Sequence, residues 1–337
     1  MKGGVTDMKE VKDKIGIHID ITNKCIFSCA NCYKFVGHLD RPYFMDLETV
    51  KKAIDSLEGF QGRIVISGGE PTLHPDFAEI CRYLRKKVPP DQRYLQTTGY
   101  KLRDYKSVIK KSFSRRVQLN DYTDQTHEYH PMLVAIEDVV TDDSLKEDLI
   151  EKCWVRERWS AMINVKGCFI CEVAGAFDIL YNGPGGLPIE KGWWAKSHEH
   201  FKEQMESYCR RCGAALPQDA VTMSDNKDHI SISHYSALEK LQTPKFQKNR
   251  VFLVKKKYSV QDIHKIAETW EPWNHKGEKD NLENKFQQYY KMIRLFLKRR
   301  AWLRYGYYEY RKFVVLTWRF LWRLSKKVDF VKVNFLN

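Results

Sequence analysis

The chain has 337 residues, of which 43% are hydrophobic and 30% are charged. This balance excludes a disordered or fibrous protein, and at roughly 150 residues per domain the length predicts about two globular domains. No apolar run approaches the ~20 residues that span a bilayer, and the polar N-terminus lacks the apolar segment of a secretory signal, so we expect a cytoplasmic protein.

The last quarter of the chain carries the net charge of +14. Residues 243–337 contain 23 Lys and Arg against 8 Asp and Glu, whereas residues 1–242 are nearly balanced. Any acidic partner would therefore concern the C-terminal quarter and not the front of the chain.

The first predicted strand, residues 14–21, runs into a loop that carries Cys25, Cys29 and Cys32 in C-x3-C-x2-C spacing. The three thiols could pack as one stripe of a helix, but the large apolar neighbours lie off that stripe and the polar residues around them favour a loop. Three closely spaced cysteines can bind three irons of a cuboidal cluster and leave the fourth iron open, as a catalytic site requires. Zinc is the weaker candidate, because no fourth ligand lies nearby.

A second motif follows the next predicted strand, residues 63–67. It reads Gly68, Gly69, Glu70 and Pro71. Two glycines let backbone groups approach a ligand, because no Cβ stands in the way. A GGEP turn alone is a weak signal, but a GGEP turn after a strand and downstream of the three-cysteine loop is a strong one.

With these two motifs, residues 15–215 resemble the radical S-adenosylmethionine (radical SAM) enzymes. In that family the three cysteines hold a [4Fe-4S] cluster, SAM chelates the open iron, and the GGEP-type turn contacts the SAM amino group. The resemblance implies reductive cleavage of SAM to a 5′-deoxyadenosyl radical, which abstracts hydrogen from a substrate. It also implies an external one-electron reductant of the flavodoxin or ferredoxin type. Tyr33, directly after Cys32, could line the adenine.

Predicted helices and strands alternate along the first half of the chain, which indicates an α/β fold with parallel βαβ units. Helical patterns start at Asp46 and cover residues 75–87, and further strands are expected at 93–100 and 116–120. Both motifs then lie at carboxyl ends of strands, where parallel barrels form their active sites. The resemblance implies a TIM-like partial (β/α)6 barrel, whose last two strands we expect within 161–180 or in reduced form.

Polar residues at two strand ends are further candidates for cofactor binding. Thr98, at the centre of residues 97–99, could line the cofactor, and Asn120 could meet its ribose. Ordinary turn chemistry at a strand end is the competing interpretation for both. His127 and His130 follow on a polar loop and could contact substrate, although we expect such histidines to be solvated. No side chain is assigned as the catalytic residue.

A second cysteine region covers residues 151–216, and the ninth cysteine, Cys81, is expected to be buried in a helix. The five cysteines of this region are Cys153, Cys168, Cys171, Cys209 and Cys212. Two C-x2-C pairs form a strong metal signature, of zinc or of an iron–sulfur cluster.

The second cysteine region resembles the auxiliary (twitch or SPASM-like) extension of radical SAM enzymes. The resemblance implies one further iron–sulfur cluster, with zinc as the less favoured metal. Its implied ligands are Cys153, Cys171, Cys209 and Cys212, with Cys168 as an alternative ligand. Four thiolates would close this site, which suits a structural role or electron relay.

We therefore divide the chain into three parts: a partial barrel at 1–150, a small cysteine-rich auxiliary domain at 151–216, and a basic helical extension at 217–337. The extension mixes tryptophan with arginine, which suits an anionic membrane surface. An ordinary packed appendage is an equal alternative, and binding of single-stranded nucleic acid is a lesser one. Binding to an anionic membrane surface would place the protein peripherally at the inner face of the membrane.

The sequence leaves the substrate open between a peptide and a sugar-linked or nucleotide-linked compound. The rival interpretation is a non-catalytic Fe–S or Zn binding module, tethered to a membrane surface or to RNA. The open cysteine triad together with the GGEP turn favours the enzyme, because a closed structural site needs neither.

Overall fold

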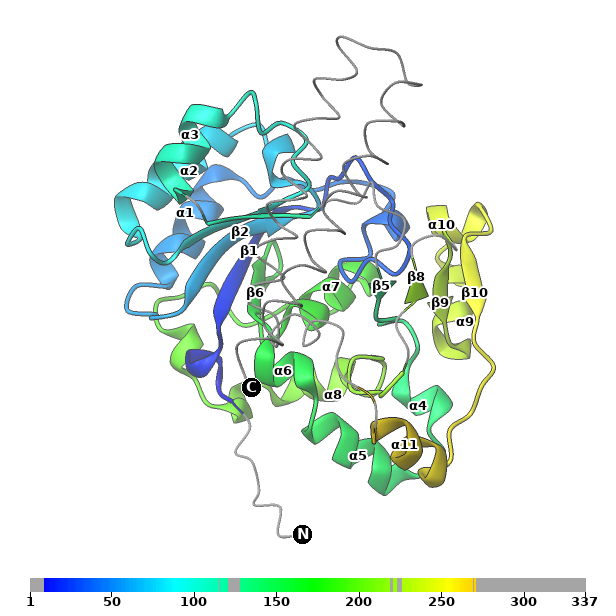
Figure 1. Ribbon diagram of the computed structural model, residues 1–337. Coiled ribbons are helices and arrows are strands. Elements are labelled where there is room, and N and C mark those ends of the chain that lie inside the picture. The colour runs from blue at the N-terminus through cyan, green and yellow to red at the C-terminus, as the bar shows by residue number, and fades with distance from the viewer. Residues whose placement is uncertain are drawn as a thin grey trace, which may run out of the picture. The chain divides into compact units, whose positions relative to one another are not determined.

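Among the described residues of the computed structural model, the largest sheet has six strands (Figure 1). The described residues lie in one compact unit, Met1–Trp273. The structure describes residues 9–114, 116–120, 128–218, 221–222, 226–268 and 270. His127 and most of the basic extension, with the membrane-surface prediction attached to it, lie outside these residues.

The sheet is parallel except at one edge, and its spatial order is β4-β3-β2-β1-β6-β7. Its strands are β1 (Gly16–Thr22), β2 (Arg63–Gly68), β3 (Arg93–Thr97), β4 (Val117–Leu119), β6 (Ala161–Asn164) and β7 (Gly167–Phe169). Only β7 is antiparallel, to β6. The α/β fold with a partial barrel is thus confirmed. Both remaining strands lie within 161–180 as expected, but only β6 continues the parallel order of a (β/α)6 barrel.

β1 is buried along its whole length because it is flanked by β2 and β6. Ile17, Ile19 and Ile21 are fully buried on one side of the strand. The alternating residues His18 and Asp20 are buried as well. Alternation of apolar and polar residues usually indicates a strand with one exposed face. In β1 the polar residues His18 and Asp20 lie inside the protein instead.

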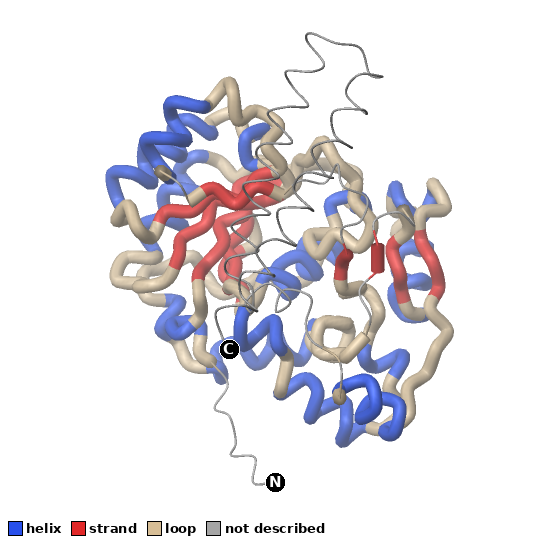
Figure 2. The backbone as a smooth tube through the Cα atoms, viewed as in Figure 1, coloured by secondary structure: helices blue, strands red, loops and turns tan. Residues whose placement is uncertain are grey.

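Three helices pack in sequence beside the first strands (Figure 2). They are α1 (Leu47–Ser56), α2 (Phe77–Lys87) and α3 (Lys106–Phe113). α1 begins as predicted at Asp46, whose carboxylate accepts a hydrogen bond from the Thr49 amide. Cys81 on α2 is fully buried, as expected.

The remaining elements surround the second cysteine region and the segment after it. The helices are α4 (Ile136–Val139), α5 (Asp143–Glu151), α6 (Trp154–Arg158), α7 (Glu172–Tyr181), α8 (Lys202–Tyr208), α9 (Ile232–Lys240), α10 (Pro244–Gln247) and α11 (Val260–Ala267). The short strands are β5 (Glu128–Tyr129) with β8 (Val221–Thr222), and β9 (Asp228–Ile230) with β10 (Val251–Leu253). Short 3-10 helices lie at Val11–Asp13, Val36–His38, Pro71–Leu73, Trp193–Ala195 and His198–Phe201. Across the described ranges, each helix is too short or too polar to cross a membrane.

Candidate functional site

The first cysteine loop lines a cavity at the carboxyl ends of the parallel strands. The predicted residues that line it are Cys25, Cys29, Cys32, Tyr33, Gly68, Gly69, Thr97, Thr98 and Asn120. They come from the ends of β1, β2, β3 and β4, which the parallel topology brings to one edge. The other predicted residues here, Glu70, Pro71 and Gly99, do not line the cavity.

The glycines of the GGEP turn let it press against the cysteine loop. A Cβ at Gly69 would lie 2.5 Å from the Lys24 carbonyl oxygen, and one at Gly68 would lie 2.1 Å from that of Thr22. Two backbone hydrogen bonds join the segments, from the Gly69 amide to Thr22 O at 2.8 Å and from the Glu70 amide to Lys24 O at 2.7 Å. The turn therefore fixes the start of the cysteine loop, a role beyond the expected approach to a ligand.

Glu70 holds the turn in place through hydrogen bonds, although it does not line the cavity. Its fully buried carboxylate accepts hydrogen bonds from the backbone amides of Thr72 and Thr98, at 3.0 and 2.6 Å. It also accepts from the hydroxyls of Thr97 and Thr98. Pro71 starts the short 3-10 helix that follows. Glu70 thus positions Thr97 and Thr98, which do line the cavity.

A buried ion pair from beyond residue 217 holds the cysteine loop. Lys245 Nζ donates to the Cys29 carbonyl oxygen at 2.6 Å and to Asp228 Oδ1 at 2.7 Å. Asp228 also accepts from the Asn31 amide at 2.6 Å and lies 2.8 Å from His38 Nε2. The sequence shows no sign of this arrangement, because these residues are about 200 positions apart and form no motif.

Burial raises the pKa of the Cys25 thiol to about 11 and that of Cys29 to about 12. The charge of Lys245 opposes this rise at Cys29. Metal ligands must be thiolates, so metal binding at this loop releases protons and becomes tighter as the pH rises.

A group of buried charged residues adjoins the first cavity through Lys34. Lys34, which also lines that cavity, places Nζ 2.6 Å from Asp20 Oδ1 and 3.4 Å from Glu172 Oε2. The Ser67 hydroxyl donates to Asp20. Burial lowers the pKa of His18 to about 3 and raises that of Glu172, which lie 3.2 Å apart. One buried cation and two buried carboxylates are thus placed beside the cavity, and no local sequence motif marks them.

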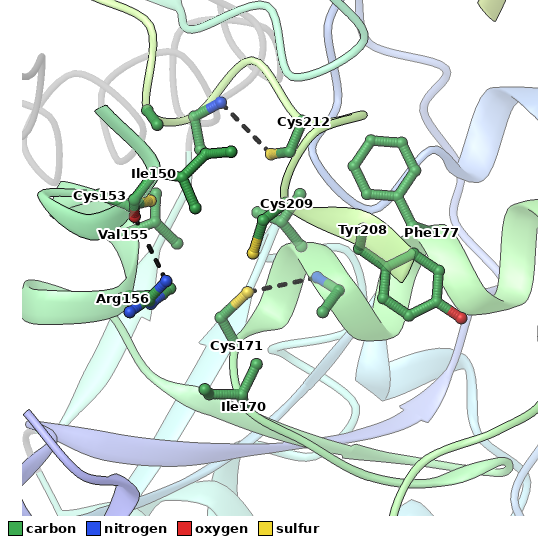
Figure 3. Close-up of a pocket in the computed structure, with 14 residues that line it drawn as sticks. Ile150, Cys153, Val155, Arg156, Ile170, Cys171, Phe177, Tyr208, Cys209 and Cys212 are labelled. Carbon is green, nitrogen blue, oxygen red and sulfur yellow. Dashed lines mark hydrogen bonds between the residues drawn. The ribbon is translucent and has the colours of Figure 1, made fainter. Parts of the chain in front are cut away.

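The second cavity is lined by four of the five cysteines of the 151–216 region (Figure 3). They are Cys153, Cys171, Cys209 and Cys212. The rest of the lining is mainly apolar, with Ile150, Val155, Ile170 and Phe177 around the sulfurs. Cys168 does not line this cavity; it is fully buried on β7, with Sγ 3.7 Å from the Pro188 carbonyl oxygen.

Backbone amides already face two of these sulfurs. Cys171 is the N-cap of α7, and its Sγ accepts from the Ala174 amide at 3.4 Å. Cys212 Sγ accepts from the Ala214 amide at 3.3 Å. Burial raises the pKa of both thiols. Amide donors stabilise thiolates, so these two positions suit metal ligands.

The four thiols of the second cavity, in a mainly apolar lining, fit an iron–sulfur cluster or zinc. The three thiols of the first cavity fit a [4Fe-4S] cluster that has one iron without a protein ligand. No three His, Cys, Asp or Glu side chains among the described residues stand in the arrangement of a ready metal site. The case for metal therefore rests on the donor sets and on the cavities that the thiols share.

His130 is not solvated, which corrects the expectation for the polar loop. It is 3% exposed, and its Nε2 lies 2.7 Å from the Gly213 carbonyl oxygen. Burial lowers its pKa to about 4. His130 therefore packs under the segment that follows Cys212.

Comparison with known proteins gives one family match. Residues 19–120 match the model of the Radical SAM superfamily. The S-adenosylmethionine-dependent nucleotide dehydratase of Selenomonas ruminantium is 39% identical over 72 residues, 21% of this chain and 24% of that protein. The probable GTP 3′,8-cyclase of Methanococcus maripaludis is 32% identical over 103 residues, 30% of this chain and 34% of that protein.

The chain thus matches only about a third or less of the length of these curated relatives. Among solved structures, BtrN in complex with AdoMet and 2-DOIA is 15% identical with a TM-score of 0.38. That match covers 59% of this chain and 92% of the BtrN chain.

Proposed function

Since residues 19–120 belong to the radical SAM superfamily, we propose that the chain is a radical SAM enzyme. Cys25, Cys29 and Cys32 would hold its [4Fe-4S] cluster. The observation that carries the proposal is that these three thiols share one cavity with the glycine turn and with the ends of the neighbouring strands. When bound and reduced, the cluster with SAM supplies a 5′-deoxyadenosyl radical that removes hydrogen from a substrate.

The residues around the first cavity would bind and orient SAM. Gly68 and Gly69 offer backbone groups there, and Thr98 is held in place by Glu70. We assign the ribose to Asn120 and the adenine to Tyr33, because both line the same cavity. Glu70 and Pro71 would act on SAM through the turn and not by contact.

A second [4Fe-4S] cluster is proposed for the second cavity, with Cys153, Cys171, Cys209 and Cys212 as its four ligands. All four line that cavity and Cys168 does not, which argues for this set over the alternative. The mainly apolar lining suits a closed cluster that relays electrons or stabilises the fold. Zinc remains the rival metal, and iron and zinc analysis separates the two.

The substrate class is a peptide or a sugar-linked or nucleotide-linked compound. Two relatives are named for nucleotide substrates, so nucleoside phosphates are the first class to screen. Turnover would need an external reductant of the flavodoxin or ferredoxin type. The excess positive charge of residues 243–337 would suit an anionic membrane surface on which such a substrate is presented.

Cleavage of SAM tests the proposal. Anaerobically reconstituted protein, reduced with dithionite and given SAM, should form 5′-deoxyadenosine and methionine. Cys29→Ala should abolish the product, whereas Cys81→Ala, which removes a buried thiol outside both cavities, should retain it. Absence of 5′-deoxyadenosine from iron-loaded wild-type protein would favour a non-catalytic metal-binding module.

A further inference from the structure

Two buried cations, Arg156 and Lys14, lie beside the second cavity. Arg156 is 5% exposed and Lys14 is 3% exposed, although such side chains are rarely buried unless they are paired. Arg156 belongs to α6, just after Cys153, and Lys14 precedes β1. The segments touch, because Lys14 Nζ donates to the Arg156 carbonyl oxygen at 2.5 Å. Two positive charges are therefore withdrawn from water at one place.

Neither cation forms an ion pair with a carboxylate in the part of the chain that the structure describes. The charge of Glu172 reaches Lys14, but Glu172 already lies 3.4 Å from Lys34 Nζ. Of the guanidinium nitrogens of Arg156, Nη1 donates to the Ile150 carbonyl at 3.3 Å, while Nε and Nη2 are buried without a hydrogen-bond partner. Buried charge of this kind is unfavourable unless a negative group compensates it.

The negative groups available here are the thiolates of the second cavity. Arg156 lines that cavity together with the four cysteines, and Figure 3 shows it on the side of Cys153. Lys14 reaches the same place through its hydrogen bond to the Arg156 carbonyl oxygen. Both cations therefore lie beside the same set of sulfurs.

We propose that Arg156 and Lys14 are counter-charges of a four-thiolate iron–sulfur cluster in the second cavity and raise its reduction potential. This inference rests on the second cluster proposed above. A [4Fe-4S] cluster with four thiolates is doubly negative when oxidised and triply negative when reduced. Nearby buried cations stabilise the more negative state most, since a low-dielectric surrounding screens little. Both cations would act on the cluster through their charge alone and would not bind iron.

A purely structural role is the alternative, in which the hydrogen bond from Lys14 only joins two segments. That role predicts changes in stability or iron content and no change in potential. The charge-conserving change Arg156→Lys separates the two, because it keeps the charge but loses the shape of the guanidinium. Arg210→Gln is a matched control, since Arg210 follows Cys209 but is exposed and paired with Glu147.

The experiment is an anaerobic redox titration of the full-length protein, followed by EPR. Addition of SAM identifies the first cluster, because only an open iron responds to it. Arg156→Gln and Lys14→Gln should each shift the reduction equilibrium of the second cluster at least tenfold, which lowers its midpoint potential by about 59 mV. The midpoint potential of the first cluster should stay unchanged in both variants. Arg156→Lys should keep the potential of the second cluster close to the wild-type value, and Arg210→Gln should leave it unchanged.

The outcomes separate this inference from the proposal beneath it. Wild-type protein with iron for a single cluster would overturn the second cluster and this inference together. Two clusters whose potentials stay unchanged in Arg156→Gln and Lys14→Gln would overturn the inference alone. If Arg156→Gln fails to fold, Lys14→Gln decides the matter, since a lowered potential of the second cluster supports the inference and a wild-type potential contradicts it.

Discussion

The ammonium group of Lys245 donates a hydrogen bond to the carbonyl oxygen of Cys29 at 2.6 Å, across 216 positions of sequence. Lys245 is 1% exposed and forms a buried ion pair with Asp228. The three-cysteine loop is therefore held by a segment that carries no recognisable motif. The first cavity depends on residues from both ends of the described chain.

Replacing Lys245 by Met should destabilise the protein and empty the first cluster site. The change leaves Asp228 buried without its cation, which typically costs about 3–5 kcal/mol. Urea unfolding together with iron analysis measures both effects. Lys248→Met, an exposed position in the same segment, is the control and should behave as wild type. Full iron content and unchanged stability in Lys245→Met would contradict the positioning role.

Much of the first site could be predicted from sequence, because its ligands lie close together along the chain. The spacing of Cys25, Cys29 and Cys32, and the strand before Gly68, are local patterns that the structure reproduces. Asp228 and Lys245 could not be predicted, since a long-range ion pair leaves no local pattern. The positive φ of Asn31 belongs to the same contact, because its amide donates to Asp228.

The sheet order was equally inaccessible to sequence reasoning. β6 pairs with β1 and not with β4, so the fifth parallel strand lies on the far side of the first. Short apolar runs predict strands but not their neighbours. The role of Glu70 was also missed, since a motif indicates which residues matter and not whether their side chains face the cavity.

Glu70→Gln should weaken SAM binding without removing the first cluster. The amide replaces one acceptor oxygen by a donor, which then faces the hydroxyl and amide donors of Thr97 and Thr98. Loss of charge-assisted hydrogen bonds costs about 1.5–3 kcal/mol, or roughly tenfold to a hundredfold in affinity. Equilibrium binding of SAM to iron-loaded protein measures it. Glu79→Gln, on the exposed face of α2, should bind SAM normally; equal affinity in Glu70→Gln would show that the turn does not need the carboxylate.

Gly69→Ala should separate the GGEP turn from the cysteine loop. The added methyl group would lie 2.5 and 2.6 Å from the carbonyl oxygens of Lys24 and Asn23, and backbone atoms cannot move aside cheaply. We expect a loss of about 1–3 kcal/mol in unfolding free energy and reduced iron content. Thermal unfolding and iron analysis test this. Gly192→Asn is the comparison, because its added Cβ would meet nothing beyond its chain neighbours and asparagine tolerates the φ of +79° better than most residues; its loss should be smaller than that of Gly69→Ala.

Acidification should destabilise the metal-free protein below pH 6.5. Burial lowers the pKa of His18 to about 3 and the pKa values of His130 and His234 to about 4. The unfolded chain therefore binds these protons first as the pH falls, and stability is lost between pH 6.5 and about 4. Each histidine contributes up to about 1.4 kcal/mol per pH unit.

Urea unfolding at pH 7, 5.5 and 4.5 measures this slope. His130→Gln should reduce the dependence of the unfolding free energy on pH by about one proton. The variant lacks the buried imidazole that takes up a proton only after unfolding. His264→Gln, on an exposed face of α11, should leave it unchanged. Identical slopes in wild type and His130→Gln would mean that His130 is protonated in the folded protein.

The central claim is that Cys25, Cys29 and Cys32 hold a cluster with one iron free to bind SAM. EPR of the anaerobic, reduced Cys153→Ser/Cys171→Ser variant, which lacks two ligands of the proposed second site, measures this most directly with and without SAM. We expect a [4Fe-4S]+ signal whose g values change when SAM is added. A cluster signal that is the same with and without saturating SAM would contradict it.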